Sequence, residues 1–222
     1  RLYLFKMNFQ KTIIVTGSTS GIGLSIIEKF YEENFNCIIV GKVKSLVIKK
    51  LKNKFDTERT LILNLDLTKI NNVKKLIILA TKKFKKIDVL VNCAGMQVVE
   101  SLEKYNESIW KKLLDINLNA AFYMTKYTLP VMRKNNWGRI IFIASTHGLI
   151  ASINKSAYTA SKHGIVGLTK VTALETAREK ITCNSICISI ADASHTGIGT
   201  FDMNYSLLEA RTTLIASSPS PI

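Results

Sequence analysis

A tyrosine and a lysine four residues apart carry the clearest chemical signal in this sequence. Tyr158 and Lys162 lie in the run SAYTASK at the start of a predicted helix, and their spacing places both on one helix face. A phenol with a pKa of about 10 is a poor base at neutral pH, but a neighbouring ammonium group stabilises the phenolate. Ser145 follows the preceding predicted strand, where its hydroxyl would donate a hydrogen bond to a substrate oxygen. Together these residues suit proton removal from an alcohol while a hydride leaves for a nicotinamide.

A glycine-rich turn near the amino terminus predicts a dinucleotide site. Residues 16–23 read TGSTSGIG, between a β-branched run and a helical pattern. Glycines allow close backbone approach to a pyrophosphate, and the helix N-terminus adds unpaired N–H groups and partial positive charge. The spacing is Gly-x3-Gly-x-Gly, and a purely structural turn is the alternative, but the strand before and the helix after favour the dinucleotide interpretation. The predicted contacts are Gly17, Thr19, Ser20, Gly21, Ile22 and Gly23.

Two further predicted strand ends belong to the same site, because ligands of doubly wound sheets lie outside the carboxyl ends of the strands. They supply the predicted cofactor contacts Asp66 and Leu67, and then Asn92, Ala94 and Gly95 in the run NCAG. At the end of the second predicted strand, where a ribose-binding acid often lies, the chain has Lys42 and Lys44. Because this position has no acidic residue to repel a 2′-phosphate, the sequence leaves the choice between NAD and NADP open.

The elements that must position these residues alternate along the chain. β-branched runs predict strands at residues 12–16, 37–40, 60–65, 87–91, 139–144 and 181–188, with amphipathic helical segments between them. Such alternation implies βαβ units with right-handed crossovers. We therefore expect one α/β domain over residues 1–188, for dinucleotide binding and catalysis, built as a three-layer, doubly wound parallel sheet of the Rossmann type.

These motifs resemble the short-chain dehydrogenase/reductase family. The resemblance rests on TGSTSGIG, NCAG, INLNAAF, IAS and YTASK, and it covers about residues 9–188. It implies a catalytic tetrad in which an asparagine helps to hold a water for proton relay; the four residues are Asn117, Ser145, Tyr158 and Lys162. It also implies that Tyr158 and Lys162 contact the cofactor. The family usually has NNAG where this chain has NCAG, so Cys93 replaces an asparagine.

Within the family, residues 137–177 are similar to members that interconvert D-3-hydroxybutyrate and acetoacetate. That resemblance favours NAD over NADP. It also implies that the substrate carboxylate is bound by Gln97, His147 and Lys155, beside Ser145 and Tyr158. A lysine, a histidine that donates and an amide are suitable carboxylate ligands. Taken alone, His147 is equally compatible with a hydrogen-bonded turn residue.

The composition changes after Cys187. Residues 1–188 hold 30 of the 31 basic and 13 of the 16 acidic residues, a net charge of +17, whereas residues 189–222 carry a net charge of −2 and no lysine. The family follows its Asn-x-Ile-Cys run with Pro-Gly, a substrate-covering segment and a final strand, and none of these is visible here. We expect residues 189–222 to be a divergent or frameshifted tail, not a separate domain, with the final strand missing or altered. The family is commonly homotetrameric, so this tail predicts poor assembly and an exposed sheet edge.

Composition excludes several other classes of protein. The chain has 222 residues, of which 47% are hydrophobic, and no apolar run approaches the roughly 20 residues that cross a membrane. Four scattered cysteines without a CxxC pair predict neither a disulfide framework nor a metal site, and they favour a reducing cytoplasm. We expect the opening residues not to act as a secretory signal, and Met7 is a candidate natural start.

Two alternatives to an active dehydrogenase remain at this point. The tail leaves open a truncated or degenerate family member that binds nucleotide with weak or no catalysis. The net charge of +15 suggests a second alternative, a polyanion-binding protein. However, the lysines recur at helical spacing, which is typical of solvated helix faces, and no nucleic-acid motif accompanies them. We therefore expect a small hydroxy acid as the partner, and neither a specific nucleic acid nor a membrane.

Overall fold

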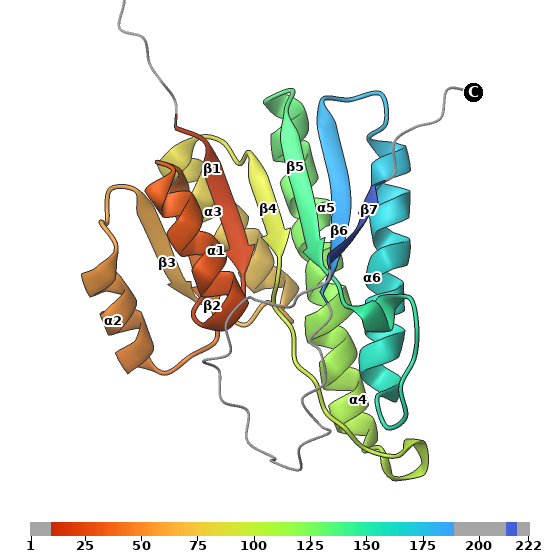
Figure 1. The fold of residues 1–222 in the computed structure, drawn as a ribbon. Helices are drawn as coiled ribbons and strands as arrows, with labels where there is room; N and C mark the ends of the chain where they lie inside the picture. Colours follow the sequence, from red (N-terminus) through yellow and green to blue (C-terminus); the bar gives the residue numbers. More distant parts are fainter. Residues whose placement is uncertain (1–9, 189–211, 217–222) are drawn as a thin grey trace, which may run out of the picture.

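A computed structural model describes residues 10–188 and 212–216, which form an α/β fold around one central sheet (Figure 1). The sheet has seven strands in the order β3-β2-β1-β4-β5-β6-β7. They are β1 (Thr12–Thr16), β2 (Asn36–Gly41), β3 (Thr60–Asn64), β4 (Val89–Asn92), β5 (Gly138–Ile143), β6 (Ile181–Ile188) and β7 (Thr212–Ala216). The six strands predicted from β-branched runs are all present, and their bounds differ from the expected ones by at most two residues.

Helices connect successive parallel strands. They are α1 (Gly21–Glu32), α2 (Ser45–Lys54), α3 (Ile70–Phe84), α4 (Glu107–Leu114), α5 (Ala120–Lys134) and α6 (Ser156–Glu175). Short 3-10 turns lie at Leu102–Lys104 and Thr146–Gly148, and a π-helical turn, Asp115–Asn119, joins α4 to α5. No helix in the described part of the chain is long and apolar enough to span a membrane.

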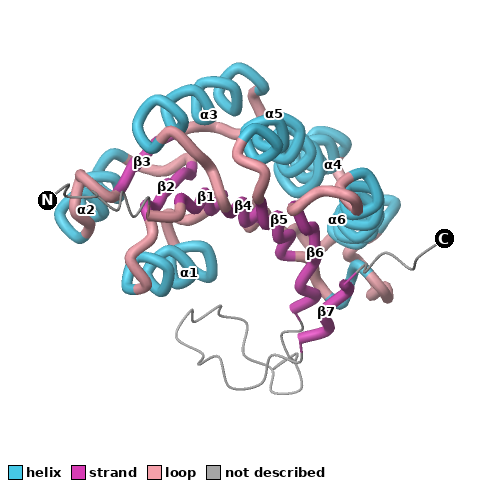
Figure 2. The backbone as a smooth tube through the Cα atoms, turned by 90° about the horizontal axis from the view of Figure 1, so that it is seen from above, coloured by secondary structure: helices cyan, strands magenta, loops and turns pink. Residues whose placement is uncertain are grey.

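The helices cover both faces of the sheet, so the fold has the expected three layers. Seen from above, α3 and α5 lie on one face and α1 lies on the other (Figure 2). Strand β1 shows why the sheet must be covered twice, because Ile14 packs in the core beneath α3 and α5 while Ile13 and Val15 pack with Ile27 of α1. All four side chains are fully buried. A strand buried on both faces is typical of a parallel sheet between helices.

The carboxyl-terminal edge of the sheet differs from the parallel pattern. Strands β1 to β6 pair in parallel, whereas β7 pairs antiparallel with residues 184–188 of β6. The final strand is therefore present but altered. The expectation of an exposed edge is wrong for residues 184–188 of β6, because β7 occupies the ladder positions along that part of the strand. Met7 and most of the predicted tail, residues 189–211 and 217–222, lie outside the described residues.

Candidate active site

The glycine-rich turn joins β1 to α1 at the carboxyl edge of the sheet. Gly17 and Gly21 have φ angles of +66° and +53°, which L side chains rarely adopt. A Cβ on Gly17 would lie 2.7 Å from the Cα of Ala94, and a Cβ on Gly23 would lie 2.6 Å from the carbonyl oxygen of Gly17. The turn is thus pressed against the NCAG segment and against its own helix, and only glycine fits at these two positions.

The outer side of this turn fits a pyrophosphate. A Cβ on Gly21 would meet nothing within 4 Å, and Ser20, Gly21 and Ile22 are exposed. No side chain caps the N-terminus of α1, and its first turn carries no acidic residue. Free N–H groups and partial positive charge therefore face an open surface, as phosphate binding requires. Thr19 is different, because it is only 7% exposed and packs beside Gly41.

Two hydroxyl side chains that the sequence analysis missed tie this turn to the neighbouring strands. The Oγ1 atom of Thr16 accepts hydrogen bonds from the backbone nitrogens of Cys93 and Ala94, at 2.9 and 3.0 Å. Ser18 donates its hydroxyl to the Val15 carbonyl and accepts from the Val40 nitrogen at 3.1 Å. The signal that could have found both residues is a hydroxyl beside a glycine where the strand ends.

Two predicted cofactor contacts have side chains that point into the protein instead. The Asn92 side chain is buried, and its amide donates to the Thr125 hydroxyl at 3.3 Å, on helix α5. Leu67 is 3% exposed and belongs to the main core. A ligand would therefore contact these two residues through their main-chain atoms. Gly95, in contrast, is exposed beside the buried Asn117.

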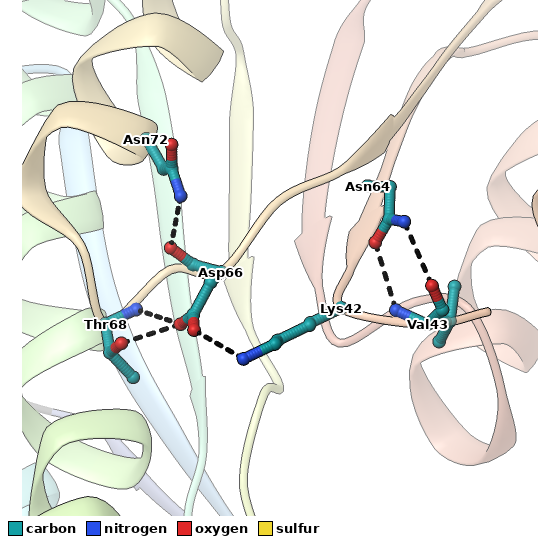
Figure 3. Close-up of polar contacts among 6 residues, drawn as sticks. All are labelled: Lys42, Val43, Asn64, Asp66, Thr68 and Asn72. Atoms are coloured by element: carbon teal, nitrogen blue, oxygen red, sulfur yellow. Dashed lines mark hydrogen bonds and ion pairs between the residues drawn. The ribbon is translucent and has the colours of Figure 1, made fainter. Parts of the chain in front are cut away.

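Asp66 lies where β3 gives way to α3, and an ion pair joins it to the end of β2. The Nζ atom of Lys42 is 2.9 Å from an Asp66 carboxylate oxygen, and Thr68 donates both its hydroxyl and its backbone N–H to the other oxygen (Figure 3). The Thr68 hydrogen bond and the contact with Lys42 hold the pKa of Asp66 at about 2. The carboxylate is therefore ionised at neutral pH.

Tyr158, Lys162 and Ser145 come together as predicted, but not with the predicted electrostatics. Lys162 is 7% exposed, and its Nζ donates to the Ile143 carbonyl at 2.7 Å and lies 5.6 Å from the centroid of the Tyr158 ring. Burial lowers the pKa of Lys162 to about 8. Burial raises the pKa of Tyr158, and a hydrogen bond with Ser145 works in the opposite direction. The expected lowering of the phenol pKa by Lys162 is wrong for this geometry, because the ammonium is engaged by a strand carbonyl.

Asn117 lies in the π-helical turn and is 2% exposed. Its amide nitrogen donates to the Met96 carbonyl at 2.9 Å and to the Ser161 hydroxyl at 3.2 Å, while its oxygen accepts from the Met96 nitrogen at 2.8 Å. Ser161 in turn donates to the Tyr158 carbonyl. The Asn117 side chain thus joins the segment after β4 to α6. Both its amide nitrogen and its amide oxygen already have hydrogen-bond partners.

His147 is a predicted carboxylate ligand that the structure brings into contact with Ser145 and Tyr158. Its Nδ1 atom lies 3.3 Å from the Ser145 hydroxyl, and its ring packs edge-on against that of Tyr158, with centroids 5.7 Å apart. Its Nε2 atom is 2.9 Å from the hydroxyl of Ser152, another residue that the sequence analysis missed. Gly148 permits this arrangement, since a Cβ there would lie 2.9 Å from the Lys162 carbonyl.

The other two predicted carboxylate ligands lie on neighbouring segments. Lys155 is half-buried, immediately precedes α6 and forms an isolated parallel bridge with Glu100. Gln97 is exposed two residues after the NCAG run. Both residues therefore lie on segments next to those that carry Ser145 and Tyr158.

Comparison with known proteins agrees with this geometry. Residues 11–199 match the family described as short chain dehydrogenase. D-beta-hydroxybutyrate dehydrogenase from Cupriavidus necator is 44% identical over 178 residues, which are 80% of this chain and 69% of that protein. The protein of the same name from Rhizobium meliloti is 40% identical over 180 residues, 80% of this chain and 70% of its own.

A solved structure supports the fold as well as the sequence match. The crystal structure of an actinorhodin polyketide ketoreductase with NADPH superposes with a TM-score of 0.75 at 31% identity, over 80% of this chain and 69% of that one. The glycine turn, the Tyr158 and Lys162 pair and these matches lead to one conclusion: the chain belongs to the short-chain dehydrogenase family of nicotinamide-dependent oxidoreductases.

Proposed function

We propose that this chain interconverts D-3-hydroxybutyrate and acetoacetate, with NAD as the hydride acceptor. The observation that carries the proposal is the contact of His147 with both Ser145 and Tyr158, at 3.3 Å between polar atoms and 5.7 Å between rings. It sets a potential carboxylate ligand beside the residues that would handle an alcohol proton. The relatives named D-beta-hydroxybutyrate dehydrogenase support the same substrate.

The substrate hydroxyl would be held between Ser145 and Tyr158. Ser145 donates a hydrogen bond to the substrate oxygen, and the Tyr158 oxygen removes its proton. When bound, the nicotinamide supplies the acceptor for the hydride that leaves the same carbon. His147 and Lys155, with Gln97, hold the carboxylate at the other end of the substrate through charge-assisted hydrogen bonds.

Lys162 and Asn117 would support the proton transfer to Tyr158. Lys162 must exchange the Ile143 carbonyl for the ribose hydroxyls or the phenolate before its charge can stabilise the base. The Asn117 amide is engaged by Met96 and Ser161, so a relay water at this residue would use its main-chain groups. The side chain then acts as the tie that keeps the π-helical turn against the site.

The residues described around the glycine turn fit a dinucleotide. The open side of Gly21 and the uncapped start of α1 would face the pyrophosphate. Ala94 and Gly95 would allow close approach of the cofactor, and Asp66 would face its adenine end. We propose NAD on the strength of the family resemblance, while Lys42 leaves NADP possible. Four free cysteines support a reducing compartment such as the cytoplasm. We also propose residues 1–188 as the single functional domain.

The direct test is NADH formation, followed by its absorbance, with D-3-hydroxybutyrate as substrate. The L enantiomer and a secondary alcohol without a carboxylate are the controls, and both should react at least about a hundredfold more slowly. Tyr158→Phe keeps the ring but removes the ionisable hydroxyl, so turnover should fall at least about a hundredfold while NADH binding survives. Equal rates with the carboxylate-free alcohol would contradict the proposed substrate, and unchanged turnover in Tyr158→Phe would remove it from the mechanism.

A non-catalytic, nucleotide-binding family member is the second candidate. The observation that favours it is the end of β6, where Ile188 and Ser189 stand in place of the family's Pro-Gly and β7 runs antiparallel. NADH binding without turnover on any hydroxy acid would support this candidate. The polyanion-binding alternative requires salt-dependent retention on DNA in a protein that binds no dinucleotide.

A further inference from the structure

The Ser152 hydroxyl lies beside His147, on the side of the ring that faces away from Ser145. Its oxygen is 2.9 Å from Nε2 of His147, whereas Nδ1 of the same ring is the atom near the Ser145 hydroxyl. Ser152 is exposed, and the proposed function gives it no role. It is therefore an accessible hydroxyl at normal hydrogen-bond distance from a proposed ligand of the substrate carboxylate.

Backbone hydrogen bonds fix the turn that leads from His147 to Ser152. The backbone nitrogens of Leu149 and Ile150 both donate to the Thr146 carbonyl, at 2.9 and 3.0 Å. The chain therefore turns back directly after His147, and Ser152 meets the imidazole ring from the returning part of this loop.

The same loop, between β5 and α6, is tied to the segment that carries Gln97. The Glu100 nitrogen donates to the Asn154 carbonyl at 2.9 Å, and Glu100 forms a parallel bridge with Lys155. Ser152 lies two residues before Asn154, and Gln97 lies three residues before Glu100. Ser152 and the proposed carboxylate ligands are therefore carried by two segments that are bound to each other.

The contact between Ser152 and His147 joins two groups that can each donate a hydrogen bond to an anion. An ionised carboxylate only accepts hydrogen bonds, and it does so through both of its oxygens. Without substrate, the hydroxyl and the ring nitrogen satisfy each other at 2.9 Å. When a carboxylate binds, rotation about the Cα–Cβ bond of Ser152 directs its hydrogen to one oxygen, while Nε2 donates to the other. A neutral hydrogen bond is then replaced by two charge-assisted ones.

We propose that Ser152 is a specificity-determining residue that binds the substrate carboxylate together with His147. The inference rests on the proposed function, because it needs a carboxylate beside His147. Ser152 adds a donor without adding charge, whereas Lys155 supplies a positive charge. A neutral end group gains less from these donors than an anion does, so Ser152 should strengthen the preference for hydroxy acids over neutral alcohols.

Binding of acetoacetate and acetoacetamide to protein saturated with NAD tests the inference, with calorimetry as the readout. Ligand and cofactor are then both oxidised, so no hydride transfer interferes, and the amide keeps the shape of acetoacetate without its charge. We expect Ser152→Ala to weaken acetoacetate about tenfold and acetoacetamide less than about twofold. Ser152→Thr keeps a hydroxyl and should retain the affinity for acetoacetate within about threefold. Ser152→Asp places a negative charge beside the anion, so it should weaken acetoacetate further than Ser152→Ala does.

Ser156→Ala is the matched control on the same stretch of chain. The Ser156 hydroxyl is buried and has no hydrogen-bond partner within the described part of the chain, so its loss should change the affinity for acetoacetate less than about twofold. The affinity for NAD should stay within about twofold of the wild-type value in Ser152→Ala and Ser156→Ala alike.

The outcomes separate this inference from the proposed function. If the wild type prefers acetoacetate to acetoacetamide and Ser152→Ala leaves that preference unchanged, the inference is overturned and the proposed substrate stands. Equal losses for both ligands in Ser152→Ala would also overturn it, because Ser152 would then act only by positioning His147. A wild type that binds NAD but does not prefer acetoacetate would reject the proposed substrate together with this role of Ser152.

Discussion

Lys162 is a buried cation whose nearest polar partner is a neutral carbonyl. Burial lowers its pKa from 10.5 to about 8, and the neighbouring thiols of Cys93 and Cys187 would oppose that shift only if they were ionised. Burial raises the pKa of both thiols, so they remain protonated at neutral pH and supply no fixed negative charge. The charged form of Lys162 is therefore less favourable in the folded protein than in the unfolded chain. A residue kept for stability alone would not carry this charge.

Lys162→Met should change how stability depends on pH. Below pH 8 the lysine is charged in both states, and its burial opposes folding by about 3 kcal/mol. Between pH 8 and 10.5 the unfolded chain binds the proton and the folded protein does not, so wild-type stability rises with pH relative to the variant. Urea unfolding at pH 7 and pH 10 measures this difference. Lys170→Met, at an exposed lysine of the same helix, is the control. A wild-type-minus-variant difference that is independent of pH would contradict the expectation.

Lys155 tests recognition of the substrate carboxylate. It is half-buried immediately before α6, three residues before Tyr158. Lys155→Ala should raise the KM for D-3-hydroxybutyrate at least about tenfold and leave NADH affinity within about twofold, because the proposed role of the lost charge is to bind the substrate carboxylate. Steady-state kinetics and cofactor titration give the two values. Loss of cofactor affinity to the same extent as substrate affinity would assign Lys155 a structural role.

The tyrosine and lysine were predictable from sequence, whereas their electrostatics were not. A spacing of four residues on a helix is a local property, so it placed Tyr158 and Lys162 on one face. The bond from Lys162 to the Ile143 carbonyl depends on how α6 packs against β5, residues 19 positions apart in the chain. Likewise, the sequence predicted that Asn92 would face the cofactor, but the position of Thr125 on α5 decides where its amide points.

The helices and strands could be predicted from the sequence to a similar degree. Strands β1 and β6 match the expected residues because β-branched runs with clear ends mark them. The π-helical turn at Asp115–Asn119 was not predictable, because its apolar periodicity is hardly different from that of an α-helix. The turn coincides with a tertiary contact, in which Asn117 binds both backbone groups of Met96. Strand β7 was missed although TTLIA is β-branched, because its pairing with β6 crosses a long stretch of chain.

A substitution at Thr16 tests how much its hydrogen bonds stabilise the junction between β1 and β4. Its Oγ1 atom accepts from two backbone nitrogens of the NCAG segment, and the isosteric change Thr16→Val leaves both N–H groups without that partner. We expect the free energy of unfolding to fall by about 1–3 kcal/mol, and NADH affinity to fall as the segment loosens. Thr12→Val on the same strand is the matched control, because its hydroxyl has no hydrogen-bond partner among the described residues. Equal effects in the two variants would show that Thr16 acts only by packing.

The oligomeric state depends on the surface of the whole molecule. The family resemblance implies tetramers in which the final strand contributes to one interface, and here the final strand runs antiparallel. Helices α5 and α6 expose Phe122, Val171 and Leu174 by 43%, 52% and 70%. We therefore expect sedimentation velocity to show no stable tetramer, while a dimer through α5 and α6 is compatible with this surface. Leu174→Asp should then favour the monomer. A stable wild-type tetramer would show that the altered strand still completes the second interface.

The whole molecule should bind its cofactor better than it turns over its substrate. The contacts proposed for pyrophosphate, adenine and ribose all lie within residues 10–188, whereas the family's substrate-covering segment corresponds to positions after Ile188. Hydride transfer needs close positioning and exclusion of water, and a misplacement of about 1 Å reduces a rate by about a hundredfold. We expect calorimetry to show clear NADH binding and steady-state assays to give a turnover number well below the usual enzyme median of about 10 per second. Turnover near that median, with normal NADH binding, would mean that the residues after β6 replace the family's Pro-Gly turn and cover the reacting carbon. The second candidate function would then be rejected together with this prediction, because both depend on an incomplete site beyond Ile188.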